Sequence, residues 1–120
     1  MLSAGKATHK LAFFEQYNYI VVINKLKFDW DLAKAQSNIN KHGISFDEAS
    51  TVFYDELARL IPDPDSSNLE ERFIILGQSK NQKLLVVCHC YRDQEQVIRI
   101  ISARRADKHE RKSYEVFRHA

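Results

Sequence analysis

The sequence predicts one α+β domain, in which helices pack against an antiparallel sheet. Three runs rich in β-branched and aliphatic residues, 72–77, 83–90 and 96–103, are joined by short polar connections, as in an antiparallel meander. Two helix signals precede them between residues 31 and 53, and a charged helix over 107–117 closes the chain. A length of 120 residues, with 44% apolar and 28% charged residues, suits a single globular domain.

The two helices before the meander have well-marked ends. Asp31 is placed to cap the start of the first helix, and Gly43 to end it in the left-handed conformation. Ser45 and Glu48 have the spacing of a capping box for a second, short helix. The first helix is expected to bury an apolar stripe and to turn its polar residues away from the core. These residues are Leu32, Ala35 and Ile39 for the stripe, and Lys34, Asn38 and Lys41 for the polar face.

Two strands are predicted outside the meander. The first is expected at the start of the domain, where Phe28 and Trp30 share strand parity and are predicted core residues. The second is expected over 57–61 and stops at a turn that begins with Pro62. The predicted order of elements is therefore β-α-α-β-β-β-β-α.

The last strand carries the most informative pattern. Residues 96–105, QVIRIISARR, hold β-branched residues at both parities, which indicates a strand buried on both faces. The run then changes to Ser102, Arg104 and Arg105. A packed strand would therefore present a hydroxyl and two guanidinium groups at its end, and arginine offers a planar fork of donors to a phosphate. The alternative is that these arginines are simply solvated.

Residues 1–27 are expected to be an N-terminal extension of unknown role, with the domain proper over 28–120. The apolar part of the extension, 11–23, is too short and too polar for a membrane span. No small-residue cleavage site follows it, which argues against a signal peptide. Residues 19–23 suit an extra strand, a segment packed on the domain or a partly disordered segment, and the sequence does not distinguish these.

Charge is unevenly distributed along a chain whose net charge is +2. Basic and acidic residues number four and one in 1–27, seven and twelve in 28–95, and seven and three in 96–120. A basic C-terminal quarter beside an acidic middle permits contact with a polyanion on one face. A solvated helix has the same composition, so charge alone does not decide.

The two cysteines, Cys88 and Cys90, lie two residues apart in a predicted strand, so they share a face at or beyond the usual disulfide distance. Two reduced thiols indicate a reducing compartment, and we expect a cytoplasmic protein. His89 would point to the opposite face, and no second pair of ligands follows at zinc spacing. Neither a metal site nor a cofactor is predicted.

Two motifs, KHGISFDEA from residue 41 and RIISARRADKHERKSYE from residue 99, lie within a broader resemblance over 28–118. This stretch resembles the BrnT family of bacterial type II toxins, whose fold is similar to that of the RelE ribonuclease toxins. The resemblance implies a RelE-like antiparallel sheet with two N-terminal helices and a C-terminal helix.

The same resemblance implies an endoribonuclease toxin that cleaves RNA, inhibits translation and is held inactive by a cognate antitoxin. That partner is typically a BrnA-like ribbon-helix-helix protein, and promoter DNA is bound only through the antitoxin complex. The alternative is a non-catalytic protein-binding subunit of a toxin-antitoxin transcriptional repressor complex.

RNA cleavage through the 2′-hydroxyl needs a base for its proton, cations for the transition state and an acid for the leaving oxygen. Arg104 and Arg72 are the predicted transition-state cations. Lys41 and His42 offer a cation and a group that titrates near neutrality, although His42 is equally suited to cap the first helix. Glu71 is a candidate base or an ion-pair partner on an exposed strand. No carboxylate cluster has metal-ligand spacing, so we expect metal-independent cleavage.

Four further residues are predicted to contact RNA: Arg105, Ser102, Lys108 and Arg111. Each has an alternative. Ser102 suits a hydrogen bond to backbone, and the two helical cations lie among glutamates, as on an ordinary solvated helix. Neighbouring strand residues point to opposite faces, so Arg105 would point away from the face that Arg104 occupies.

Overall fold

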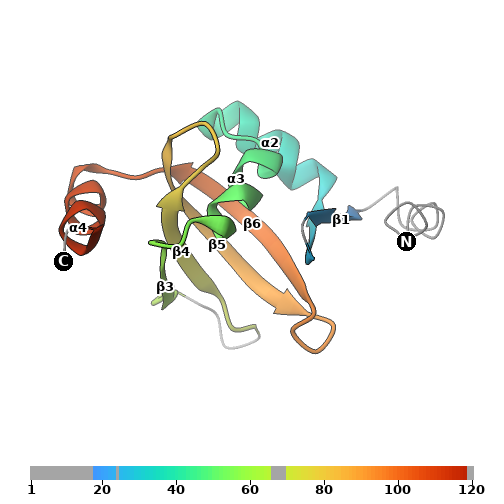
Figure 1. The fold of residues 1–120 in the computed structure, drawn as a ribbon. Helices are drawn as coiled ribbons and strands as arrows, with labels where there is room; N and C mark the ends of the chain where they lie inside the picture. Colours follow the sequence, from blue (N-terminus) through green and yellow to red (C-terminus); the bar gives the residue numbers. More distant parts are fainter. Residues whose placement is uncertain (1–17, 24, 66–69, 119–120) are drawn as a thin grey trace.

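The computed structural model describes residues 18–23, 25–65 and 70–118, whose strands form a single mixed sheet (Figure 1). Helices pack on both faces of this sheet. The sheet has six strands in the order β1-β2-β6-β5-β4-β3. The strands are β1 (Asn18–Ile23), β2 (Leu26–Asp31), β3 (Arg59–Pro62), β4 (Phe73–Gln78), β5 (Leu84–Arg92) and β6 (Val97–Arg105). The helices are α2 (Leu32–His42), α3 (Phe46–Thr51), the 3-10 turn η1 (Val52–Tyr54) and α4 (Lys108–Arg118).

Strands β3 to β6 form the antiparallel meander that the sequence predicts, and the predicted order of elements is confirmed for the domain. The sheet as a whole is mixed rather than antiparallel, because β2 lies parallel to β6, with Phe28 opposite Ile98. The chain leaves β2 through α2 and α3, makes the three other meander strands and only then returns as β6. A crossover of this length allows parallel neighbours.

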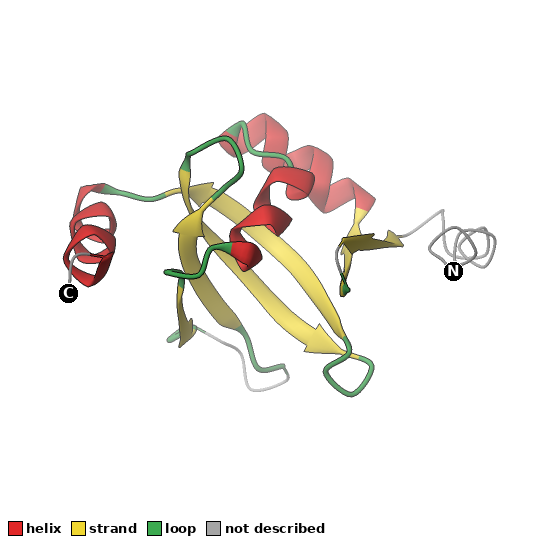
Figure 2. Cartoon of the chain, viewed as in Figure 1, coloured by secondary structure: helices red, strands yellow, loops and turns green. Residues whose placement is uncertain are grey.

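The sheet separates two apolar clusters. We call its two sides the α2–α3 face and the α4 face. On the α2–α3 face, both helices pack over the larger cluster, and α3 lies directly in front of the sheet in Figure 2. Its members include Phe28, Trp30, Ile44, Phe46, Ala49, Val52, Ile75, Leu85, Val87, Ile98, Ile100 and Ala103. The smaller cluster, on the α4 face, contains Leu76, Leu84, Val86, Ala106 and Tyr114. None of the helices in the described ranges is long and apolar enough to cross a membrane.

The helix caps agree with the sequence, with one exception. The Lys34 amide donates to Asp31 at 3.1 Å, and Gly43 adopts a left-handed φ of 72°. The Glu48 amide donates to the Ser45 hydroxyl at 3.0 Å, as a capping box requires. The Glu48 side chain does not return the bond. It is buried and accepts instead from the Ser79 hydroxyl at 2.7 Å, so it joins α3 to the β4–β5 connection.

The predicted faces of α2 are wrong at two neighbouring residues. Ile39 is 43% exposed, whereas Asn38 is buried at 6%. The Asn38 amide donates to the carbonyls of Ile44 and Ala103 at 2.9 and 2.8 Å, and its oxygen accepts from the Ala103 amide at 3.1 Å. These three hydrogen bonds satisfy backbone groups that would otherwise be buried without partners. The prediction placed Asn38 on the solvent-exposed face because its side chain is polar, whereas this side chain joins α2 to β6.

Residues 18–23 form an extra strand, which is one of the three alternatives that the sequence leaves open. β1 pairs antiparallel with β2 from Asn18 opposite Asp31 to Ile23 opposite Leu26. The first strand of the domain therefore begins at Leu26, two residues before the predicted boundary. Residues 1–17 of the predicted extension lie outside the described residues.

Trp30, a predicted core residue, is buried, and so is His89. The imidazole of His89 lies edge-on to Phe53 and Tyr91, with ring centroids 4.8 and 5.4 Å away. Its nitrogens lie 3.2 Å from the Val87 carbonyl and 3.3 Å from the Tyr91 hydroxyl. Burial lowers the pKa of His89 from 6.5 to about 4, so the ring is neutral at physiological pH.

We predict that Asn38→Ala lowers the free energy of unfolding by about 3 kcal/mol or more, because it leaves three buried backbone groups without partners. Asn40→Ala is the matched control, since Asn40 is exposed on the same helix and should cost less than about 0.5 kcal/mol. Urea denaturation of both variants measures the difference. Equal losses would show that the three hydrogen bonds contribute nothing beyond helix propensity.

We also predict that stability falls as the pH drops from about 6.5 to about 4. In this window the unfolded chain protonates His89 and the folded chain does not, so the unfolded state binds more protons and is favoured. One such group accounts for up to about 3 kcal/mol. Urea melts at several pH values should show a smaller slope for His89→Phe than for the wild type. Identical slopes would mean that His89 is protonated equally in both states.

Candidate active site

A β-bulge in β6 decides which way its arginines point. Ile98 and Ile100 pack on the α2–α3 face, and so does Ala103, which has the opposite parity. The register shifts between them, because Cys88 lies opposite Ser102 whereas His89 lies opposite Ile100. The extra residue re-aims the rest of the strand. Without it, Ser102 and Arg104 would face α2 and α3 rather than α4.

The re-aimed strand completes a row of side chains across the α4 face. Arg104 of β6 lies opposite Val86 of β5, Val86 lies opposite Leu76 of β4, and Leu76 lies opposite Arg59 of β3. We call these four residues the arginine row. Four adjacent strands place its two ends about 14 Å apart. The row therefore has a guanidinium group at each end and an aliphatic middle.

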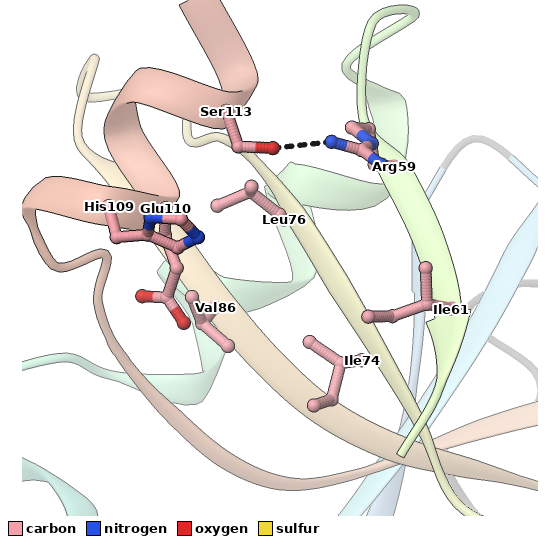
Figure 3. Close-up of a pocket in the computed structure, with 8 residues that line it drawn as sticks. All are labelled: Arg59, Ile61, Ile74, Leu76, Val86, His109, Glu110 and Ser113. Carbon is pink, nitrogen blue, oxygen red and sulfur yellow. Dashed lines mark hydrogen bonds between the residues drawn. The ribbon is translucent and has the colours of Figure 1, made fainter. Parts of the chain in front are cut away.

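Helix α4 is fastened to both ends of the arginine row. Arg104 donates from both terminal nitrogens to the two carboxylate oxygens of Glu110, at 2.9 Å each. At the other end, Arg59 donates to the Ser113 hydroxyl (Figure 3). The hydrogen bond and charge of each partner raise the pKa of Arg104 and lower that of Glu110. Both groups are consequently charged at physiological pH.

A cavity of about 190 Å³ lies between α4 and strands β3, β4 and β5. Figure 3 shows aliphatic side chains from the sheet on one side of it and polar side chains around the rest. The lining residues are Arg59, Ile61, Ile74, Leu76, Val86, His109, Glu110 and Ser113. A space of this size admits one sugar or one base rather than a length of polymer, since pockets for larger ligands are about 300 Å³ or more.

Three predicted site residues share the α4 face, namely Ser102, Arg72 and Arg104. Ser102 lies opposite Cys88, on the same side of the sheet as Arg104. Arg72 precedes β4, and its charge acts on the Cys88 thiol. Asp63 lies in the same group, with its carboxylate 3.6 Å from the Cys88 sulfur. Burial and Asp63 raise the pKa of Cys88 to about 11, so this thiol is protonated and is not a nucleophile at neutral pH.

The remaining predicted catalytic residues and the predicted RNA contact Arg105 lie elsewhere. Lys41 and His42 are exposed at the end of α2, which packs on the opposite face of the sheet. Arg105 lies opposite Leu85, a residue of the α2–α3 face, as strand alternation predicts. Glu71 lines a separate hollow whose walls include the carboxylates of Glu70 and Glu95. The structure therefore does not gather these four residues around Arg104, and their roles stay predictions.

The two predicted RNA contacts on α4 are both exposed. Arg111 lines a small hollow with Gln78, Leu84 and Glu115, away from the lining of the larger cavity. Within the described ranges, no three side chains of His, Cys, Asp or Glu lie together as a metal ion would require.

Sequence reasoning missed four polar residues at the cavity, namely Arg59, His109, Glu110 and Ser113. Arg59 sits on a short edge strand whose partner could not be assigned without the register. His109 and Ser113 are four residues apart on α4, so they share one side of the helix with Glu110 between them. The four-residue spacing of His109 and Ser113 was the available sequence signal for a shared helix side. The many charged residues of the same helix made this spacing hard to recognise.

A family model described as the ribonuclease toxin BrnT of type II toxin-antitoxin systems matches residues 30–110. The chain belongs to this family. Family membership implies ribonuclease activity and an antitoxin partner, and it confirms the resemblance that the two motifs indicate. The match runs from the end of β2 to the first turn of α4 and so includes the arginine row and the β6 bulge.

A solved structure supports the same fold. The crystal structure of the Brucella abortus ribonuclease toxin BrnT matches with a TM-score of 0.51 and 23% sequence identity. The match covers 66% of this chain and 94% of the Brucella protein. Among curated proteins, none matches this chain.

Proposed function

We propose that this BrnT-family protein is a metal-independent endoribonuclease that cleaves RNA on the α4 face of its sheet and thereby inhibits translation. The arginine row is the observation that carries the proposal, because it places Arg59 and Arg104 on rigid strands of one face. Arg59 lines the cavity, and Arg104 binds Glu110, which also lines it. Arginine binds phosphate through two parallel hydrogen bonds, which makes it suited to a phosphoryl transition state.

The chemistry assigned to this face is transfer of the phosphate to the neighbouring 2′-hydroxyl. Two negative charges accumulate on the phosphoryl oxygens in the transition state, and Arg104 and Arg72 are proposed to stabilise them. Ser102 lies one strand position from Ala103, whose backbone is fixed by Asn38, and it is proposed to orient the phosphate. Cleavage of this kind leaves 2′,3′-cyclic phosphate or 3′-phosphate ends.

In the structure, Glu110 occupies the edge of Arg104 that would bind a phosphate. The pair is partly solvated, with side chains 43% and 26% exposed, so it stabilises the fold by no more than about 1 kcal/mol. A phosphate of RNA therefore competes with a weakly held carboxylate. We propose that Arg104 changes partner from Glu110 to RNA when substrate binds.

The remaining proposals concern partners and context. The antitoxin is proposed to be a BrnA-like ribbon-helix-helix protein, with promoter DNA bound only by the complex, and the protein is proposed to act in the cytoplasm. The catalytic domain is proposed to be residues 28–120, because every residue assigned to the chemistry lies within it.

We predict that the purified protein cleaves a labelled RNA in the presence of EDTA and leaves cyclic or 3′-phosphate ends. Cations from the protein supply the charge that a metal ion would otherwise provide. Gel analysis of the products, with and without phosphatase treatment, measures the ends. Activity that is lost in EDTA and restored by Mg²⁺ would contradict the metal-independent mechanism. Absence of cleavage in every buffer would favour the non-catalytic repressor subunit.

We predict that Arg104→Ala lowers the cleavage rate about 10²–10³-fold, as loss of a preorganised donor does in other enzymes. Arg104→Lys should recover only part of the rate, because a point charge does not reproduce a bidentate contact. Arg92→Ala is the matched control, since it also removes an arginine held by a glutamate, Glu70, at 2.9 Å.

Cleavage rates should be read beside thermal melts of the same three variants. If Arg104→Ala loses activity but melts cooperatively and close to the wild-type temperature, the result supports a role for Arg104 in the active site. Full activity of Arg104→Ala, or a loss equal to that of the Arg92 control, would remove it.

A further inference from the structure

We propose that His109 is the catalytic residue that accepts the 2′-hydroxyl proton, an assignment that rests on the proposed function and adds a base to it. His109 lies on the first turn of α4 and lines the cavity beside the arginine row (Figure 3). A sugar that enters the cavity would therefore have the His109 imidazole and the Arg59 guanidinium beside it, and Glu110, the partner of Arg104, in the same lining. A general base must first meet this geometric condition.

The carboxylates of this face are already committed. Glu110 accepts from both terminal nitrogens of Arg104 and from the Asp107 amide at 2.8 Å, and its pKa is lowered. A carboxylate with a lowered pKa is a weak base at neutral pH. Asp63 accepts from the Asp65 amide at 2.9 Å and contacts the Cys88 thiol. Both carboxylates are therefore already engaged as hydrogen-bond acceptors.

The other histidines with described side chains are excluded by place or by protonation. His89 is enclosed in the core on the α2–α3 face, where burial holds its pKa at about 4. His42 ends α2 on that same side of the sheet. His109 alone among these three combines exposure to solvent with a position at the cavity. A neutral imidazole nitrogen can accept a proton from a hydroxyl group, which is what the base requires.

The step balances without any further reactant. Neutral His109 takes the 2′-hydroxyl proton while the 2′-oxygen forms a bond to phosphorus, and Arg104 balances the charge on the phosphoryl oxygens. The bond from phosphorus to the 5′-oxygen breaks, and that oxygen leaves with the electron pair and takes a proton from water. The resulting hydroxide receives the proton from the His109 imidazolium. The products are a 2′,3′-cyclic phosphate and a free 5′-hydroxyl.

The charged groups that face His109 are Arg59 from β3 and Glu110 from its own helix, with Arg104 of β6 bound to Glu110. The arginines do not titrate in the accessible range, and the pKa of Glu110 is lowered. An acidic limb of the pH–rate profile that is lost from His109→Gln is therefore assigned to His109. The rate rises with pH along this limb because only a neutral imidazole can accept the proton.

The test compares His109→Gln with the wild type and with Val116→Ala, using a labelled RNA and the full chain. Val116 is 66% exposed on the same helix and does not line the cavity, so its variant controls for changes in α4. His109→Gln should lower kcat about 10²–10⁴-fold, as loss of a general base does, with KM little changed. The acidic limb of its pH–rate profile should disappear, and imidazole added to His109→Ala should restore part of the rate.

Three results would overturn the assignment. His109→Gln with the kcat of the wild type would do so, and so would an acidic limb that survives in that variant. An acidic limb lost from His42→Gln instead would move the base to α2. If the wild type cleaves no RNA, the proposed function fails and the assignment fails with it, so the two failures are distinguishable.

Discussion

The hydrogen bonds between Asn38 and Ala103 are the constraint on which the site depends. β2 pairs with β6 only at Phe28 and Asp29, so the next part of β6 lacks a strand on that side. The Asn38 amide takes its place and satisfies both backbone groups of Ala103. The bulge at the preceding residues and the arginine that follows are thereby held to α2. A helix on one face of the sheet thus fixes the direction of a cation on the other.

Helix α4 depends on polar contacts more than on burial. Its described anchors are the Arg104–Glu110 pair, the Arg59–Ser113 hydrogen bond, and Tyr114, whose hydroxyl donates to Asp55 at 2.7 Å. Tyr114 is also its buried side chain in the small cluster. Partly solvated ion pairs contribute little stability, so α4 is held in register by several weak contacts. Helix α4 can therefore hold His109 at the cavity while Glu110 releases Arg104 to bind a substrate phosphate.

Local signals predicted the elements well, and long-range geometry limited the site. Asp31, Gly43 and Ser45 marked helix ends correctly because capping depends on neighbours in sequence. The predicted burial of Asn38 and Ile39 was the reverse of the observed burial. A buried amide that bonds to backbone distant in sequence leaves no local sequence pattern. The bulge in β6 was equally invisible. Strand parity separated Arg104 from Arg105 correctly, but it could not place Arg59 opposite Leu76 or His109 at the cavity.

The central claim is that RNA binds on the α4 face, and the arginine side-chain NMR signals test it most directly. A 2′-O-methyl RNA has no nucleophile and so forms a stable complex. The account predicts that the Nε–H signals of Arg59, Arg72 and Arg104 shift on titration, while that of Arg92 stays in place. Shifts confined to the end of α2, at Lys41 and His42, with the Arg104 signal unchanged, would contradict it.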